Sequence, residues 1–310
     1  MGNNRVCHSR ASGNPFIIFV TLLILGLSFG LSSCNQKDPY PTGDFYAVIV
    51  SDTHVSRDES KIERLDKLSK MINTGVLPKV EFVVNTGDVV SRVYGDYRPD
   101  TPDSSDNRLR RAVEAFNKLQ VPWYFVMGNH DYKIGPDRDS DTYFPKEEIE
   151  MMEKIWKKET GFNPYYSFDH GNWRFITLNS MRGRYLHRQF DDHQIEWLVN
   201  QLQDEKPAIL FFHHPMETDN FTLWAHPKDV ITEESEPQFY QILKEHKDQI
   251  KGIFVGHGHR WVEDNLFDKI KVYETNSFAD EDELMYYVVG FDTLNKTISV
   301  GKNVIPETIN

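Results

Sequence analysis

The sequence is poor in cysteine and in positive charge. Only two cysteines, Cys7 and Cys34, occur in 310 residues, which argues against a disulfide-rich scaffold and against a structural zinc site. The 35 lysines and arginines are outnumbered by 47 acidic residues, and the net charge is −12. Because general nucleic-acid binding leaves a basic footprint, we expect no nucleic acid partner. No internal repeat or low-complexity tract stands out, so a repeat architecture is not indicated.

The composition that remains is that of an ordinary globular protein. Aromatic residues make up 13% of the chain and charged residues 26%, which is unlike a disordered protein. The length is sufficient for one large α/β domain with a well-filled core.

The N-terminal segment differs from the rest of the chain. Arg5 and Arg10 precede the apolar run PFIIFVTLLILGLSFGL, and the first acidic residue is Asp38. A positively charged start followed by an apolar run is typical of a secretory signal, and this run is a little short for a spanning helix. The run ends in LSSC at residues 31–34, which resembles the lipobox of bacterial lipoproteins, where cleavage precedes a lipidated cysteine.

This resemblance implies three parts of the chain. Residues 1–33 are expected to be a removed signal peptide, residues 34–44 a tether anchored to the membrane through lipid on Cys34, and residues 45–310 the functional domain. The expected location is the bacterial cell envelope, periplasmic or surface-exposed. An uncleaved N-terminal anchor is the alternative.

From residue 45 onwards, apolar β-rich runs alternate with segments of helical periodicity. The expected helices are 59–73, 108–119, 147–160 and 191–202, and the expected strands are 45–51, 80–86, 122–127, 208–214 and 250–259. A hairpin is expected over 165–180, and the last forty residues are expected to form two or three strands, with a hairpin over 286–301. This order predicts an α/β fold with a mixed sheet or two stacked sheets.

Five of the expected strands end in side chains that bind metal ions. The five motifs are VSDTH, NTGD, GNHD, FFHHP and GHGH, which end near residues 54, 88, 131, 215 and 259. Each motif alone has an ordinary explanation, such as a turn or a helix cap. Ligands of open α/β sheets bind outside the carboxyl ends of the strands, so we expect the five motifs to surround one crevice. The one-residue gap in GHGH predicts two imidazoles on one face of an extended segment.

The ligand types indicate the kind of metal. Asp, His and Asn side chains together suit borderline divalent ions such as Mn²⁺, Fe²⁺ or Zn²⁺. There are too many ligands for one ion, so the sequence predicts two divalent ions that share a carboxylate.

In their order along the chain, the motifs D-x-H, G-D, G-N-H-D, H and G-H-x-H resemble those of the calcineurin-like metallophosphoesterase superfamily. The resemblance spans residues 52–259 and implies two stacked mixed β-sheets flanked by helices, a four-layer α-β-β-α sandwich. It implies that one metal is bound by Asp52, His54 and His259, that the other is bound by Asn129, His213 and His257, and that Asp88 bridges the two. His130 would be the acid that protonates the leaving oxygen, oriented by Asp131. Between His213 and His214 we favour His213, because it lies nearer the strand.

The resemblance also implies a reaction, the hydrolysis of a phosphoester of a small organic compound by water that two metals activate. The segment Gln194–Leu198, Q-x-x-W-L, is similar to a region of class III cyclic-nucleotide phosphodiesterases and favours a diester substrate. Trp197 and Leu198 could instead serve only to pack a helix on the sheet. The alternatives are a phosphomonoesterase, a phospholipid or nucleic-acid hydrolase, and a non-catalytic binding protein.

Overall fold

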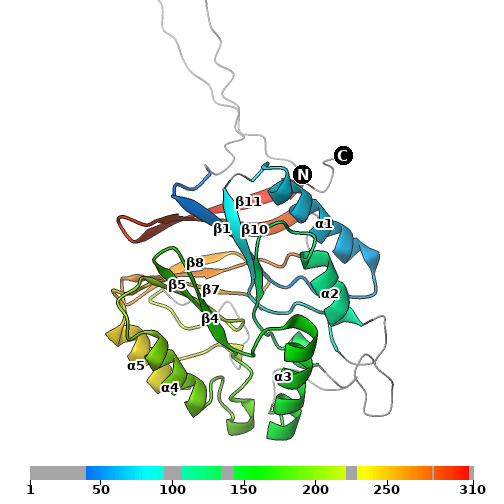
Figure 1. The fold of residues 1–310 in the computed structure, drawn as a ribbon. Helices are drawn as coiled ribbons and strands as arrows, with labels where there is room; N and C mark the ends of the chain where they lie inside the picture. The colour runs from blue at the N-terminus through cyan, green and yellow to red at the C-terminus, as the bar shows by residue number, and fades with distance from the viewer. Residues whose placement is uncertain are drawn as a thin grey trace, which may run out of the picture. The chain divides into compact units, whose positions relative to one another are not determined.

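Runs of β-branched and aromatic residues build two sheets in this protein (Figure 1). The computed structural model describes residues 40–77, 79–93, 107–133, 143–220, 229–280 and 283–306. All of them belong to one compact unit, Lys37–Asn310. The predicted signal peptide and most of the tether lie outside the described residues, and so does Cys34.

The first sheet has five strands in the order β11-β10-β1-β2-β3. Its parallel part consists of β1 (Phe45–Val50), β2 (Val80–Asn85) and β3 (Trp123–Phe125). The hairpin of β10 (Glu283–Asp292) and β11 (Thr297–Pro306) pairs with β1 in the antiparallel sense.

The second sheet has six strands in the order β4-β5-β6-β7-β9-β8. Four of them are parallel: β5 (Trp173–Thr177), β6 (Ala208–Phe211), β7 (Ile250–Val255) and β9 (Ile270–Glu274). The two edges, β4 (Tyr166–His170) and β8 (Val262–Leu266), are antiparallel to their neighbours.

Helices cover the outer face of each sheet. The five-stranded sheet packs against α1 (Glu59–Asn73), α2 (Arg108–Phe116) and α3 (Lys146–Thr160), and the six-stranded sheet packs against α4 (Asp192–Gln201) and α5 (Pro237–Glu245). Three helices begin at a capping side chain that accepts a hydrogen bond from a backbone N–H of the first turn: α1 at Asp58, α2 at Asn107 and α4 at Asp191. Two short 3₁₀ helices, η1 (His130–Tyr132) and η2 (Arg184–Leu186), lie in the connections.

Aromatic side chains fill the space between the two sheets. Phe82 of β2 and Phe175 of β5 meet with ring centroids 4.9 Å apart, and Phe45 stacks on Phe291 at 4.7 Å. Burial of each such ring stabilises the fold by about 1.5–3 kcal/mol. The predicted four-layer fold with two stacked mixed sheets is therefore confirmed.

The strands that lead into the motifs are shorter than the sequence predicts. Strands β3, β6 and β7 end at Phe125, Phe211 and Val255, although the predicted strands continue to residues 127, 214 and 259. Helix α5 and strand β8 are not among the expected elements. Within the part of the chain that the structure describes, no helix is both long and apolar enough to cross a bilayer.

Candidate metal centre

The five motifs converge on one place, because the strands that carry them are neighbours with a common direction. Strands β1, β2 and β3 are adjacent and parallel in one sheet, and β6 and β7 are adjacent and parallel in the other. Direct contacts then join motifs that are up to 207 residues apart in sequence. The structure thus brings the five motifs together, as the sequence predicts.

The first group of predicted ligands is Asp52, His54 and His259. Their ligand atoms lie within 4.8 Å of one another. His259 Nε2 is 3.2 Å from Asp52 Oδ1 and 3.3 Å from His54 Nε2. The other oxygen, Asp52 Oδ2, accepts hydrogen bonds from the Ser51 hydroxyl and the His257 amide, so Oδ1 is left facing the group.

The second group contains Asn129, His213 and His257, and it is more deeply buried. Asn129 Oδ1 is 3.0 Å from His213 Nε2 and 3.0 Å from His257 Nδ1. The His213 side chain is 0% exposed and that of His257 14% exposed, against 39% for His259 in the first group. The two groups therefore differ in their access to solvent.

Asp88 connects the two groups through a single oxygen. Its Oδ2 lies 3.2 Å from His213 Nε2 and 3.9 Å from His54 Nε2. Its Oδ1 accepts a hydrogen bond from the His130 amide at 2.8 Å. One oxygen thus holds the loop after β3, while the other faces both groups as a bridging ligand would. Carboxylate, amide and imidazole donors in two groups with a shared carboxylate fit two divalent cations.

His213 and His214 have different surroundings. His214 points away from the two groups, because its Nδ1 is 2.7 Å from Ser180 Oγ and its Nε2 is 3.4 Å from the Arg184 guanidinium. His213 Nδ1 is 3.1 Å from the Thr86 carbonyl, which can only accept, so Nε2 is the nitrogen that faces Asn129 and Asp88. The geometry favours His213 as the ligand, in agreement with the sequence prediction.

His130 has a different partner from the one predicted. Its Nδ1 donates to the Ser91 carbonyl at 2.7 Å, whereas the Asp131 carboxylate accepts backbone N–H groups from Gly128, Val89 and Val90. The prediction that Asp131 orients His130 is therefore wrong. The reason is that η1 turns the two successive side chains apart, and Asp131 holds the loops after β2 and β3 together instead.

Several predicted ligands have a backbone conformation that residues other than glycine rarely adopt. Positive φ angles between 41° and 72° occur at Asp52, His54, Asp88, His257 and His259. Such a conformation costs about 1–3 kcal/mol per residue and is typical of functional sites. The prediction of an extended segment for GHGH is wrong, since β7 ends at Val255 and both histidines follow in bends.

Between His257 and His259, residue 258 is a glycine because there is no space for a side chain. A Cβ on Gly258 would lie 1.9 Å from Glu274 Oε1. Glu274 ends β9 and is 1% exposed. Burial raises the pKa of Glu274 to about 9, against the opposing charge of Arg260 and with the added repulsion of Asp52. A neutral acid at this position packs against the backbone between His257 and His259.

Neighbouring charges shift the pKa values of two buried groups, Asp52 and His213, in opposite directions. Burial raises the pKa of Asp52, but the hydrogen bond from His259 and the charge of His213 outweigh it and lower that pKa to about 2. Burial lowers the pKa of His213, but the charge and hydrogen bond of Asp88 outweigh it and raise that pKa to about 10. Metal binding at His213 must therefore displace a proton.

The Q-x-x-W-L segment serves packing in this structure. Gln194 is fully buried on α4, where its amide accepts from the Asn179 N–H at 2.7 Å and donates to the Asn179 carbonyl at 3.0 Å. Leu198 is buried in the core under the six-stranded sheet, and Trp197 packs against that core and against Tyr165. The structural interpretation of Trp197 and Leu198 is confirmed.

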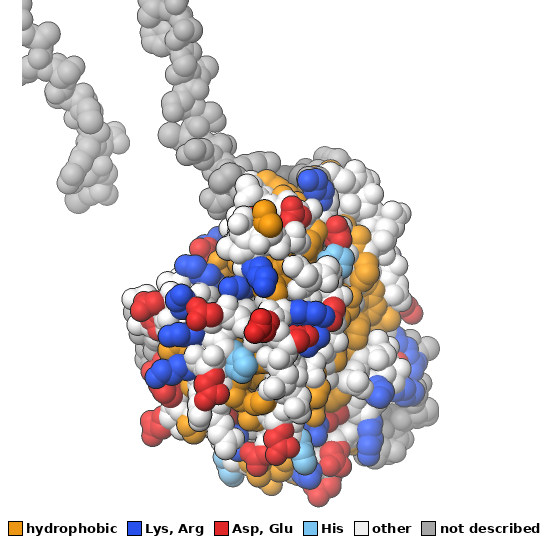
Figure 2. Space-filling view, turned by 60° about the vertical axis from the view of Figure 1, so that its left-hand side comes forward, with side chains coloured by type: hydrophobic (Ala, Val, Ile, Leu, Met, Phe, Trp, Pro, Cys, Tyr) orange, Lys and Arg blue, Asp and Glu red, His pale blue; other side chains and the backbone are white. Residues whose placement is uncertain are grey.

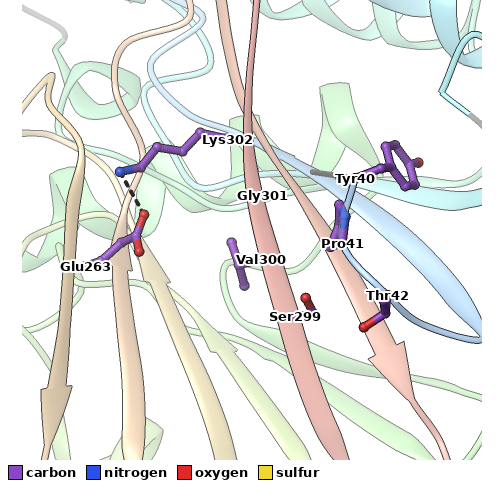
Figure 3. A pocket seen from close by; sticks show the side chains of 8 residues that line it. All are labelled: Tyr40, Pro41, Thr42, Glu263, Ser299, Val300, Gly301 and Lys302. Atoms are coloured by element: carbon purple, nitrogen blue, oxygen red, sulfur yellow. Dashed lines mark ion pairs between the residues drawn. The ribbon is translucent and has the colours of Figure 1, made fainter. Parts of the chain in front are cut away.

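The charge pattern of the surface and a separate cavity are two further features of the described residues. Figure 2 shows a face on which Lys and Arg side chains alternate with Asp and Glu, without a continuous basic stripe among the residues described there. A cavity of about 390 Å³ lies beside the edge strands β11 and β8, where Lys302 Nζ is 2.7 Å from Glu263 Oε1. Figure 3 shows its lining residues. Its lining contains none of the predicted ligands, so this cavity is separate from the metal centre.

No sequence pattern points to three further residues, which contact His130, His257 and His259. Ser91 contributes only a backbone carbonyl, which no side-chain motif can reveal. Asp229 Oδ2 lies 3.7 Å from His257 Nε2, and Asp280 Oδ2 lies 2.8 Å from His259 Nδ1. Both carboxylates come from connections outside the five motifs.

Comparison with known proteins agrees with this geometry. The family model described as calcineurin-like phosphoesterase matches residues 46–261. A probable glycerophosphodiester phosphodiesterase of Arcobacter nitrofigilis is 25% identical over 240 residues, which cover 73% of this chain and 75% of that protein. A 3′,5′-cyclic-nucleotide phosphodiesterase of Nostoc is 23% identical over 208 residues, which cover 66% of this chain and 64% of that protein. The match therefore spans just under two thirds of this second relative.

Among solved structures, a dimetal phosphatase from Danio rerio has a similar fold. The TM-score is 0.56 at 14% identity, over 86% of this chain and 100% of that one. A 5′-nucleotidase from Candida albicans gives a TM-score of 0.52, also at 14% identity, over 87% of this chain and 53% of that one. These likenesses establish the fold.

Proposed function

The chain belongs to the calcineurin-like phosphoesterase family, and we propose that it is a metal-dependent hydrolase that cleaves a phosphodiester of a small organic compound at a dinuclear centre. The observation that carries the proposal is the pair of ligand groups joined by Asp88 Oδ2. The preference for diesters is supported by two relatives that are named phosphodiesterases.

Seven side chains would hold the two ions, which we propose to be Mn²⁺, Fe²⁺ or Zn²⁺. They are Asp52, His54, Asp88, Asn129, His213, His257 and His259. Bound divalent ions would supply Lewis acidity and a nucleophilic water near neutral pH. The protein fixes the donor atoms in advance, since Asp52 and Asp88 each have one oxygen tied to an N–H of another motif.

His130 is positioned to move a proton at the open side of the site. Since Nδ1 donates to the Ser91 carbonyl, Nε2 is the nitrogen left to give a proton to the leaving oxygen. This Nε2 lies 4.0 Å from Asp88 Oδ2, and the His130 side chain is 31% exposed. The substrate would therefore approach from the side of His130 and His259, the two most exposed histidines of the site.

The test is a comparison of bis-p-nitrophenyl phosphate with p-nitrophenyl phosphate on the purified chain loaded with Mn²⁺. We expect kcat/KM to be higher for the diester. A higher value for the monoester would replace the proposal with a phosphomonoesterase. Full Mn²⁺ binding without hydrolysis of either compound would favour a non-catalytic binding protein.

We also propose that the enzyme is held at the bacterial cell envelope by lipid on Cys34. The support is the basic start, the apolar run and the LSSC segment of the sequence. The Cys34→Ser variant is expected to lose the lipid mass and to move from the detergent phase to the aqueous phase on phase separation. Unchanged partitioning of that variant would point to an uncleaved anchor instead.

A further inference from the structure

The two histidines of GHGH face the metal centre with different ring nitrogens. His257 presents Nδ1, which is 3.0 Å from Asn129 Oδ1, and His259 presents Nε2, which is 3.2 Å from Asp52 Oδ1. A neutral imidazole that binds a metal through one nitrogen carries its proton on the other. The partner of that second nitrogen therefore decides which nitrogen is available to the metal.

A carboxylate lies at the second nitrogen of each ring. His259 Nδ1 is 2.8 Å from Asp280 Oδ2, and His257 Nε2 is 3.7 Å from Asp229 Oδ2. His213 differs, since its second nitrogen meets the neutral Thr86 carbonyl. Negative charge behind an imidazole makes the ring a stronger ligand as well as fixing its orientation.

Asp280 is held in place by the loop that follows β9. The Ser277 hydroxyl lies 2.9 Å from Asp280 Oδ2, and Lys61 Nζ is 3.9 Å from Oδ1. The Phe278 amide donates to the Ser51 carbonyl at 3.0 Å, which fixes this loop to the end of β1 beside Asp52. The loop that carries Asp280 is therefore attached to the end of β1, which also carries Asp52, the ligand predicted to share a metal with His259.

Asp229 is held beside the HHP motif. Ile231 pairs with the segment after His214, since its amide donates to the Pro215 carbonyl and its carbonyl accepts from the Glu217 amide, each at 2.8 Å. Asp229 is only 5% exposed, and its Oδ1 has no hydrogen-bond partner among the described residues. Burial of such a carboxylate is costly unless it faces a donor or a positive group, and the polarised Nε2–H of His257 faces it when a cation is bound to Nδ1.

We propose that Asp229 and Asp280 are positioning residues that set the ligating nitrogen of His257 and His259, one for each metal of the proposed dinuclear centre. Asp280 acts on the metal of Asp52, His54 and His259. Asp229 acts on the metal of Asn129, His213 and His257. The inference rests on the proposed function, because it assumes that the two groups bind cations.

The test is titration of the metal-free full-length protein with Mn²⁺ by calorimetry, for the wild type and for variants of each residue. Asp280→Ala and Asp229→Ala are each expected to weaken one of the two binding steps by about 10- to 100-fold and to leave the other step unchanged. The conservative Asp280→Asn and Asp229→Asn variants are expected to recover part of the loss, because the amide oxygen still accepts a hydrogen bond. These Asn variants also keep the shape of the site should an Ala variant fail to fold.

The matched control is Glu81→Ala. Glu81 forms a similar pair with His170 at 2.6 Å and has a similar side-chain exposure, 46% against 48% for Asp280, but His170 is not a predicted ligand. This variant is expected to bind Mn²⁺ as the wild type does. In the Zn²⁺-loaded protein, imidazole ¹⁵N spectra should show the proton on Nε2 of His257 and on Nδ1 of His259, and this signature should be lost in the Ala variants.

Two failures are distinguishable. Wild-type protein that binds two Mn²⁺ ions, together with Asp229 and Asp280 variants of equal affinity, would overturn the positioning roles and leave the proposed function intact. Wild-type protein that binds no Mn²⁺ would overturn the dinuclear centre, and the inference with it.

Discussion

Several side chains of the site are held in place by a hydrogen bond between one of their polar atoms and the backbone, which leaves the other polar atom facing the site. Asp52 and Asp88 each use one carboxylate oxygen to accept an N–H from another motif, and His130 and His213 each use Nδ1 to donate to a carbonyl. Only the remaining atom of each side chain is available for a cation or for the substrate. Substitutions should therefore separate residues that hold metal from residues that move protons.

His130 is predicted to act on the leaving group. His130→Ala should keep two metals per chain but lose about 10²–10⁴-fold in kcat, the range that general acid catalysis contributes. The loss should be larger for an alkyl diester than for a p-nitrophenyl diester, because p-nitrophenolate leaves without protonation. Metal analysis and kcat for the two substrate types measure this, and loss of bound metal would make His130 a ligand instead.

Metal binding is predicted to strengthen as the pH rises. The pKa of His213 in the metal-free site is about 10, above its ordinary value near 6.5, so a proton occupies this ring at neutral pH and must leave. The Mn²⁺ dissociation constant should fall by about tenfold per pH unit between about pH 6 and about pH 8. Calorimetry across this range tests the slope, with His170→Gln as a control that should not change it. A pH-independent affinity would contradict the raised pKa.

The same raised pKa affects the stability of the metal-free protein. The ion pair of protonated His213 with Asp88 stabilises the folded state. This contribution is complete at pH values below about 6.5, the pKa of histidine in the unfolded chain. This contribution is lost as the pH rises through the folded-state value of about 10.

Helix α4 carries the Q-x-x-W-L segment, which resembles a region of phosphodiesterases but serves packing here. Gln194→Leu would leave the buried N–H and carbonyl of Asn179 without their partner, which should lower the free energy of unfolding by about 2–4 kcal/mol. The ratio of diester to monoester hydrolysis should stay the same. Chemical denaturation and the two nitrophenyl substrates test this, with the exposed Gln203→Ala just beyond the same helix as the control. A changed substrate ratio would return Gln194 to the active site.

The regular part of the fold could be predicted from the sequence because its signals are local. Helix α1 follows the predicted range 59–73, since its apolar residues recur at helical spacing and Asp58 caps it. The predicted hairpin over 165–180 is formed by β4 and β5, and Gly171 takes a positive φ at its turn.

The strand ends could not be predicted, because their geometry depends on distant parts of the chain. The sequence predicts a strand over 250–259, but β7 stops at Val255, and the two histidines that follow turn towards Asp52. The Ser91 carbonyl, Asp229 and Asp280 leave no local pattern at all. Their roles arise from tertiary contacts between loops.

The metal centre lies where the two sheets meet. The five-stranded sheet supplies Asp52, Asp88 and Asn129, and the six-stranded sheet supplies His213 and His257. Bound ions would therefore cross-link both halves of the core while they neutralise the buried Asp52 and Asp88. Removal of the ions should loosen the whole sandwich rather than one loop.

Thermal unfolding is predicted to depend on metal. At a free Mn²⁺ concentration about 100-fold above the dissociation constant, stabilisation should be about 2.7 kcal/mol per site, which corresponds to a rise in Tm of roughly 5–10 °C for a domain of this size. Calorimetric scans with Mn²⁺ and with a chelator measure the difference. An unchanged Tm would indicate that the centre binds no ion.

The most direct test of this account is the number of Mn²⁺ ions bound per chain, measured by elemental analysis of the wild type and of Asp88→Asn. The account predicts two ions for the wild type. For Asp88→Asn it predicts at most one, because the amide removes the charge and the bridging oxygen that the two groups share. A wild type with a single ion, or an Asp88→Asn variant that keeps two, would contradict the bridging role of Asp88 and with it the dinuclear centre as described.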